Sequence, residues 1–124
     1  LPGDNFKLNL GYEEGLQIER ILVEREVEVN GKYRRLTYGY KLIINNLRED
    51  KSNLKVIEQL PVSRDEEVKV SLVSTQPKIQ LGQMGELEWL LTLPRRSKRS
   101  VKRELYYQYT IEYPAEITVL SLDI

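Results

Sequence analysis

The stretch QIERILVEREVEVNGKYRRLTYGYKLIIN, residues Gln17–Asn45, decides the fold. It contains two long runs rich in β-branched and aromatic residues, which join at Asn30-Gly31. Asn-Gly between alternating apolar runs is a strong hairpin signal, because a type I′ turn needs positive φ at both central residues. The stretch therefore predicts a long hairpin whose strands are Gln17–Val29 and Lys32–Asn45.

The parity of the apolar residues predicts how these strands pair. A two-residue turn at Asn30-Gly31 places Val23 opposite Tyr38 on one face and Glu26 opposite Arg35 on the other. Both strands then direct their apolar residues to the same side. A slip of one residue would turn both apolar rows to solvent.

The first strand contains a change of parity. Leu16 and Ile18 have even numbers, whereas Ile21 and Val23 have odd numbers. A strand cannot switch faces without an irregularity, so we expect a β-bulge or a break near Glu19–Arg20.

Shorter alternating runs follow the same pattern along the rest of the chain. They predict an all-β fold, an antiparallel β-sandwich of immunoglobulin or fibronectin type with about eight strands around the long central hairpin. We expect residues 1–124 to form a single domain, the C-terminal piece of a larger protein. The further predicted strands are Phe6–Leu10, Leu54–Leu60, Val68–Leu72, Leu87–Leu93, Val101–Tyr113 and Ile117–Leu122.

Large side chains divide between the two faces of these strands. Trp89 has inward parity, which predicts a core anchor. Some apolar residues have outward parity instead, and they predict a surface covered by another part of the protein, by a partner or by a second copy. These residues are Leu22, Ile43, Val73 and Leu90.

The composition limits the chemistry that is possible. The chain has no cysteine and no histidine, which excludes disulfides, thiolate metal sites and the commonest general base. Lys+Arg and Asp+Glu are both 19, so no overall charge favours nucleic acid or an anionic membrane. No cofactor is indicated, and the composition leaves the compartment open.

Several motifs resemble a known family when taken in order along the chain. They resemble the C-terminal domain of unknown function of the mucoidy inhibitor A-like family. The resemblance implies a β-sandwich module of a larger protein and no known reaction. It is carried by Pro2–Gly11, Asn30–Tyr40, Ile44–Leu47, Leu60–Val70 (LPVSRDEEVKV), Gly85–Trp89 (GELEW) and Tyr107–Pro114 (YQYTIEYP).

Arg95–Arg103 departs from the family pattern, which has a short Pro-Gly-type turn there. Clustered cations of this kind could contact phosphate or another polyanion. They could instead be a solvated loop whose charge opposes edge aggregation, and this interpretation is favoured because the chain has no overall basic excess. The candidate residues are Arg95, Arg96, Lys98, Arg99, Lys102 and Arg103.

Two other groups of residues are candidates for a binding site. Asp65–Glu67 lacks the ligand spacing of a calcium loop and is interpreted as an exposed turn. Parity directs most tyrosines inward as core filling rather than toward a sugar-binding face. The inward tyrosines are Tyr38, Tyr40, Tyr107, Tyr109 and Tyr113, and the outward ones are Tyr33 and Tyr106.

The sequence therefore favours a non-catalytic structural or protein-interaction module. Its expected partners are other domains of the same protein or a separate protein, with nucleic acid disfavoured and weak self-association possible. The alternatives are polyanion binding through the Arg95–Arg103 loop, carbohydrate binding through exposed tyrosines, and a hydrolase that uses carboxylates alone.

Overall fold

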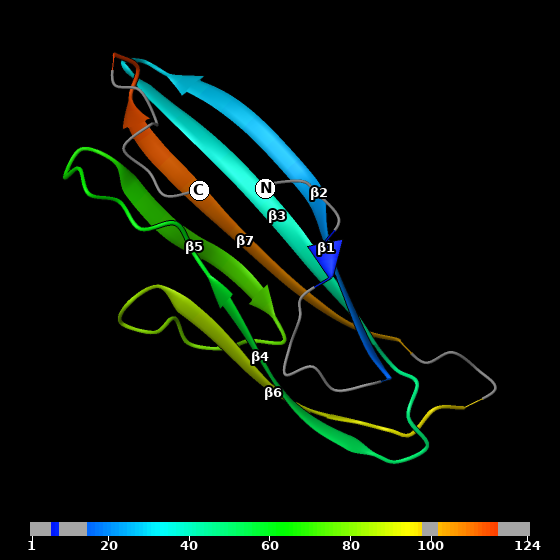
Figure 1. Cartoon of the computed structure of the whole chain (residues 1–124). Helices are drawn as coiled ribbons and strands as arrows, with labels where there is room; N and C mark the ends of the chain where they lie inside the picture. The colour runs from blue at the N-terminus through cyan, green and yellow to red at the C-terminus, as the bar shows by residue number, and fades with distance from the viewer. Residues whose placement is uncertain (1–5, 8–14, 98–101, 117–124) are drawn as a thin grey trace.

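The computed structural model describes residues 6–7, 15–97 and 102–116, and every regular element in them is a strand (Figure 1). No helix in this part of the chain is long and apolar enough to cross a membrane. The predicted all-β class is confirmed. The strands are β1 (Phe6–Lys7), β2 (Leu16–Asn30), β3 (Tyr33–Asn46), β4 (Ser52–Gln59), β5 (Lys69–Gln76), β6 (Glu86–Leu93) and β7 (Lys102–Pro114).

The strands form two antiparallel sheets. One has the order β1-β2-β3-β7-β5, and the other contains β4 and β6. Figure 1 shows β2, β3 and β7 running side by side, with β4 and β6 as a smaller separate sheet. Seven strands are described, against about eight predicted, and the predicted strand Ile117–Leu122 lies outside the described residues.

The hairpin of β2 and β3 is present, but its turn differs from the prediction. Asn30 pairs with Tyr33, so the central turn residues are Gly31 and Lys32. Gly31 has a φ of 63° and takes the left-handed position, while Asn30 remains a strand residue. The register therefore moves by two residues. Arg25 faces Tyr38 in place of the predicted Val23, and Glu26 faces Thr37 in place of Arg35.

The predicted bulge exists at a different position in β2. The register shifts between Leu22 and Glu24, so the extra residue is Val23 and the irregularity is not at Glu19–Arg20. Before the bulge, even-numbered residues share the face of the buried Tyr40 and Leu42. Leu22 consequently packs against the core, contrary to its predicted outward position, and Val23 is 48% exposed.

Both sheets contribute to one hydrophobic core. Leu42, Leu105 and Ile111 supply it from the large sheet, and Val56, Leu87 and Trp89 supply it from the small sheet. Trp89 is buried and its indole Nε1 donates a hydrogen bond of 3.2 Å to the carbonyl of Pro77. The predicted role of Trp89 as a core anchor is confirmed.

A pair of substitutions tests the position of the bulge. Ile18 is buried, so Ile18→Ala should reduce the free energy of unfolding by about 2–5 kcal/mol. Val23→Ala should reduce it by less than about 1 kcal/mol, because the Val23 side chain is half exposed. Urea unfolding of both variants measures the difference. Equal losses would place Val23 in the core and contradict the observed bulge.

Candidate functional site

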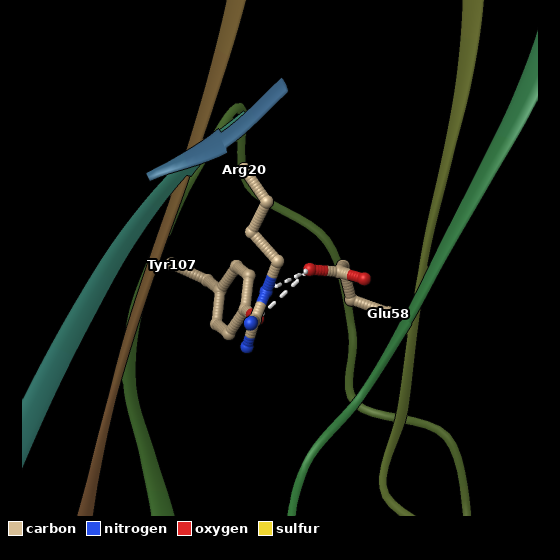
Figure 2. A network of polar contacts seen from close by, with 3 residues as sticks. All are labelled: Arg20, Glu58 and Tyr107. Carbon is tan, nitrogen blue, oxygen red and sulfur yellow. Dashed lines mark hydrogen bonds and ion pairs between the residues drawn. The ribbon is translucent and has the colours of Figure 1, made fainter. Parts of the chain in front are cut away.

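Arg20, Glu58 and Tyr107 meet between the two sheets (Figure 2). Arg20 comes from β2, where the bulge at Val23 turns it to the inner face. Tyr107 comes from β7 of the same sheet, and Glu58 comes from β4 of the other sheet. Glu58 is only 8% exposed. A buried carboxylate in an apolar core needs partners, and these two side chains supply them.

The three side chains are joined by a closed set of hydrogen bonds. Tyr107 Oη donates to Glu58 Oε1 at 2.9 Å, and Arg20 Nε donates to the same oxygen at 3.1 Å. Tyr107 Oη also accepts from Arg20 Nε at 3.3 Å and from Arg20 Nη2 at 3.2 Å. The phenol therefore bridges the cation and the carboxylate, and the network ties one sheet to the other.

Aromatic rings surround the Arg20 guanidinium. Arg20 Cζ lies 3.7 Å from the centroid of the Tyr40 ring, which is a cation–π contact. The Tyr40 and Tyr107 rings are stacked at 5.5 Å, and Trp89 contacts Tyr107 at 6.1 Å. The side chains of Arg20 and Glu58 are 15% and 9% exposed, and this burial strengthens the electrostatic interactions between them.

Burial shifts the proton affinities of all three groups. It raises the pKa of Glu58 above 4.5, and the hydrogen bond from Tyr107 and the charge of Arg20 offset this only in part. Burial raises the pKa of Tyr107, and the charge of Glu58 raises it further, so the phenol stays protonated. Burial lowers the pKa of Arg20, but Tyr107 and Glu58 raise it more, so its net pKa is raised and the guanidinium stays charged.

This network contains one carboxylate, one phenol and one permanent cation. Within the described residues, no group of three or more acidic, histidine or cysteine side chains is placed to hold a metal ion. The network was not predicted from the sequence. The signal for Glu58 was its parity, which matches the inward residues Val56 and Leu60.

The predicted polyanion contact is distributed over two described segments. Arg95 and Arg96 follow β6, and Lys102 and Arg103 begin β7. All four are exposed. Lys98 and Arg99 lie outside the described residues. Arg96 Nη2 is 3.4 Å from Glu49 Oε1, in the loop after β3. The loop after β3 therefore contacts the basic segment after β6, and the sequence did not indicate this contact.

The acidic group Asp65–Glu67 forms a turn. Ser63 Oγ accepts from the Asp65 amide at 3.2 Å and donates to the Asp65 carbonyl at 2.8 Å. Asp65 Oδ1 accepts from the Glu67 amide at 2.9 Å. The predicted turn is present, and the carboxylate of Asp65 stabilises it through this bond.

The tyrosines follow the predicted division for the most part. Tyr38, Tyr40, Tyr107 and Tyr109 are buried, while Tyr113 is half-buried. The two outward rings do not form a row: Tyr33 and Lys41 are eight residues apart on β3, and Tyr106 lies opposite Lys41. At the rise of a strand this is about 26 Å. Separation on this scale does not support a sugar-binding platform of neighbouring rings.

Tyr106 instead covers a glycine on the outer face of the large sheet. A Cβ added to Gly39 would lie 2.7 Å from Tyr106 Oη and 3.0 Å from Glu24 Cβ. Tyr106 Oη also donates to Glu24 Oε1 at 3.3 Å. The ring therefore packs over the backbone where a strand glycine leaves space, which stabilises the sheet.

The predicted outward apolar residues do not form one patch. Leu22 faces the core, Ile43 is half-buried on the outer face of the large sheet, and Val73 is the extra residue of a bulge in β5. Leu90 is 74% exposed on the small sheet. Leu22 is thus part of the core, Ile43 and Val73 lie on non-adjacent strands of the large sheet, and Leu90 lies on the small sheet, so the four do not form the predicted common surface.

A model of one protein family matches residues 3–115 and is described as Domain of unknown function (DUF4139). No curated protein matches the chain, and no solved structure matches it either.

The raised pKa of Glu58 predicts an unusual pH dependence of stability. A folded-state pKa above the unfolded value contributes stability below about pH 4.5, and this contribution is lost as the pH rises through the folded pKa. The stability of the wild type relative to Glu58→Gln should therefore fall as the pH rises from 4.5. Urea unfolding from pH 4 to pH 8 measures this difference. A relative stability that rises with pH would show that the pKa of Glu58 is lowered.

A second prediction concerns the coupling between Arg20 and Glu58. Arg20→Met should cost about 3–5 kcal/mol at pH 7, because it leaves a buried carboxylate without its cation. Adding Glu58→Leu removes that carboxylate and should restore part of the loss, with a coupling energy of about 0.5–3 kcal/mol. Denaturant unfolding of the two single variants and the double variant measures it. Additive losses would mean that the two charges do not interact.

Proposed function

The chain belongs to the family described as Domain of unknown function (DUF4139), and this description gives no activity. We propose a role from the residues at its surface and in its core. The domain is a non-catalytic protein-interaction module with a two-layer β-sandwich fold, within a mucoidy inhibitor A-like protein. Its contact surface is the outer half of β2, Glu24–Asn30. The observation that carries the proposal is that, among the residues that the structure describes, this segment pairs only with β3.

The strand edge of Glu24–Asn30 is available to a partner. β1 pairs only with Glu19 and Arg20 of β2, and among the described residues no strand pairs with Glu24–Asn30 on the side away from β3 (Figure 1). Unpaired backbone groups along an edge strand accept an added strand from another chain. Figure 1 shows β1 beside only the part of β2 farther from the hairpin turn.

Side chains on this edge define the chemistry of the partner. Val27 is 57% exposed and Val29 is 66% exposed on the inner face. Glu24, Glu26 and Glu28 lie on the opposite face, because side chains alternate along a strand. A complementary strand has apolar residues opposite the valines and lysine or arginine opposite the glutamates.

The same glutamates oppose pairing with a second copy of this chain. In an antiparallel pair of two β2 strands with matching faces, Glu26 would lie opposite Glu24, Glu26 or Glu28 of the other copy over the central registers. Like charges directly opposite each other destabilise a strand pair. The edge therefore selects a basic partner strand over self-association.

The absence of catalysis is also part of the proposal. The polar groups of Arg20, Glu58 and Tyr107 are directed at one another, which supports a structural role for them. Hydrolysis by carboxylates alone needs two facing acids. Three surface depressions lined by described residues offer at most one each: one contains Glu49, one contains Glu112 and one has no acid.

A synthetic peptide tests the strand-addition site. We expect an eight-residue peptide that alternates lysine and valine to bind, and to shift the backbone amide resonances of Glu24–Asn30 most strongly in an NMR titration. The double variant Glu26→Lys/Glu28→Lys should weaken binding at least about tenfold, because it places like charges opposite the peptide.

Exposed acids elsewhere provide the matched control. Glu66→Lys/Glu67→Lys makes the same change in net charge within a turn, and it should leave the affinity within about twofold. Equal weakening by both pairs would reduce the binding to general charge attraction. Shifts confined to β4, β5 or β6 would place the site elsewhere and refute the assignment to β2.

A further inference from the structure

Three segments meet at the end of the molecule opposite the hairpin turn. They are residues 47–51 after β3, residues 94–97 after β6, and the start of β7. Figure 1 shows the ends of β3 and β6 and the beginnings of β4 and β7 converging there. Lys102 pairs with Asn45, and the Arg96 amide donates to the Arg48 carbonyl at 2.7 Å.

A buried asparagine holds these segments together. Asn46 is 6% exposed, and its Nδ2 donates to the carbonyl of Asp50 at 3.0 Å and to the carbonyl of Pro94 at 2.9 Å. Its Oδ1 accepts from the Arg48 amide at 3.0 Å. One side chain therefore fixes the loop after β3 and the segment after β6 in a single arrangement.

The arrangement concentrates cations that are far apart in the sequence. Arg48 joins Arg95 and Arg96 through the backbone bond between the two loops, and Lys102 and Arg103 follow at the start of β7. Glu49 contacts Arg96 and balances one of these charges. A depression lined by Glu49, Arg95, Arg96 and Ser97 lies within this end. We call the five cations Arg48, Arg95, Arg96, Lys102 and Arg103 the basic end.

We propose that the basic end binds closely spaced phosphate groups of a linear polyanion. Four of its five cations are arginines, whose planar forks match the geometry of phosphate oxygens. The described segments 47–51, 94–97 and 102–104 contain no aromatic residue, so they offer no aromatic ring on which bases or sugar rings could stack. The basic end therefore recognises its ligand through the charge of the phosphate groups. This site is separate from the strand edge proposed above and does not depend on it.

Fluorescence anisotropy with labelled long-chain polyphosphate tests the proposal, at 50 mM salt and then at increasing salt. The charge variant is Arg95→Gln/Lys102→Gln, which leaves the Arg48 and Asn46 contacts in place. It should weaken binding about tenfold and should reduce the slope of log affinity against log salt by about 1.4, or about 0.7 for each lost phosphate contact.

The matched control removes two exposed cations elsewhere. Lys32→Gln/Arg64→Gln changes the net charge by the same amount, with one residue in the hairpin turn and one before the acidic turn. It should leave the affinity within about twofold. Equal weakening by the two pairs would overturn the site, as would a failure of polyphosphate to bind at 50 mM salt.

A variant without a change of charge tests the asparagine. Asn46→Ala should weaken polyphosphate binding several-fold while thermal unfolding still shows a cooperative transition, because the loops lose their common anchor. Unchanged affinity in this variant would refute the role of Asn46 in assembling the site. If the variant does not fold, Asn46→Ser is also uncharged and its single hydroxyl proton cannot donate to both carbonyls at once, so the same weakening is expected.

A second probe identifies the source of the phosphates. Labelled oligothymidylate presents a phosphate backbone whose bases meet no aromatic ring at the described part of this end. Binding of both probes with the same loss in Arg95→Gln/Lys102→Gln supports recognition of spaced phosphates from either source. Binding of polyphosphate alone supports the inorganic chain. Binding of oligothymidylate alone would contradict recognition through phosphate charge, because it would require contacts to the nucleosides.

Discussion

The extra residue at Val23 is the constraint on which the arrangement of the core depends. Side chains alternate along a strand, so one inserted residue exchanges the faces of everything before it. Here it turns Ile18 and Arg20 inward and leaves Val23 half exposed. A regular β2 would bury Val23 and send Arg20 to solvent, and Glu58 would lose its cation. The bulge thus determines both the apolar packing and the polar network.

The network formed by Arg20, Glu58 and Tyr107 is better understood as a source of specificity than of net stability. Removing two charges from water costs free energy that their attraction recovers only when the geometry is favourable. The raised pKa of Glu58 shows that burial outweighs its two partners. Apolar contacts between the sheets tolerate small sliding movements, whereas hydrogen bonds near 3 Å do not. We infer that the network fixes how β4 sits over β2 and β7.

The sequence predicted which features of the fold exist, but it did not predict the exact residues at which the turn and the bulge occur. Asn30-Gly31 correctly indicated a hairpin, but the central residues of its turn are Gly31 and Lys32. The sequence does not show whether Asn30 belongs to the turn or pairs with Tyr33 as the last residue of the strand. The parity change correctly indicated a bulge, yet parity does not specify which residue is the extra one. Trp89 and the inward tyrosines were predictable from alternation alone. The two hydrogen bonds that Asn46 donates to the carbonyls of Asp50 and Pro94 were not predictable, because tertiary structure brings these carbonyls to Asn46.

A formal net charge of zero conceals an uneven distribution of charge. Glu24, Glu26 and Glu28 line the edge of β2 toward the hairpin turn, while the basic end lies where β3 finishes. Arg35, opposite Glu28, and Asn45, opposite Lys102, are ten residues apart on β3, or about 33 Å at the rise of a strand. Charges on the surface are screened over about 8 Å at physiological salt. The charges at the two ends are therefore screened from each other, and the net charge of the chain does not describe the surface at either end.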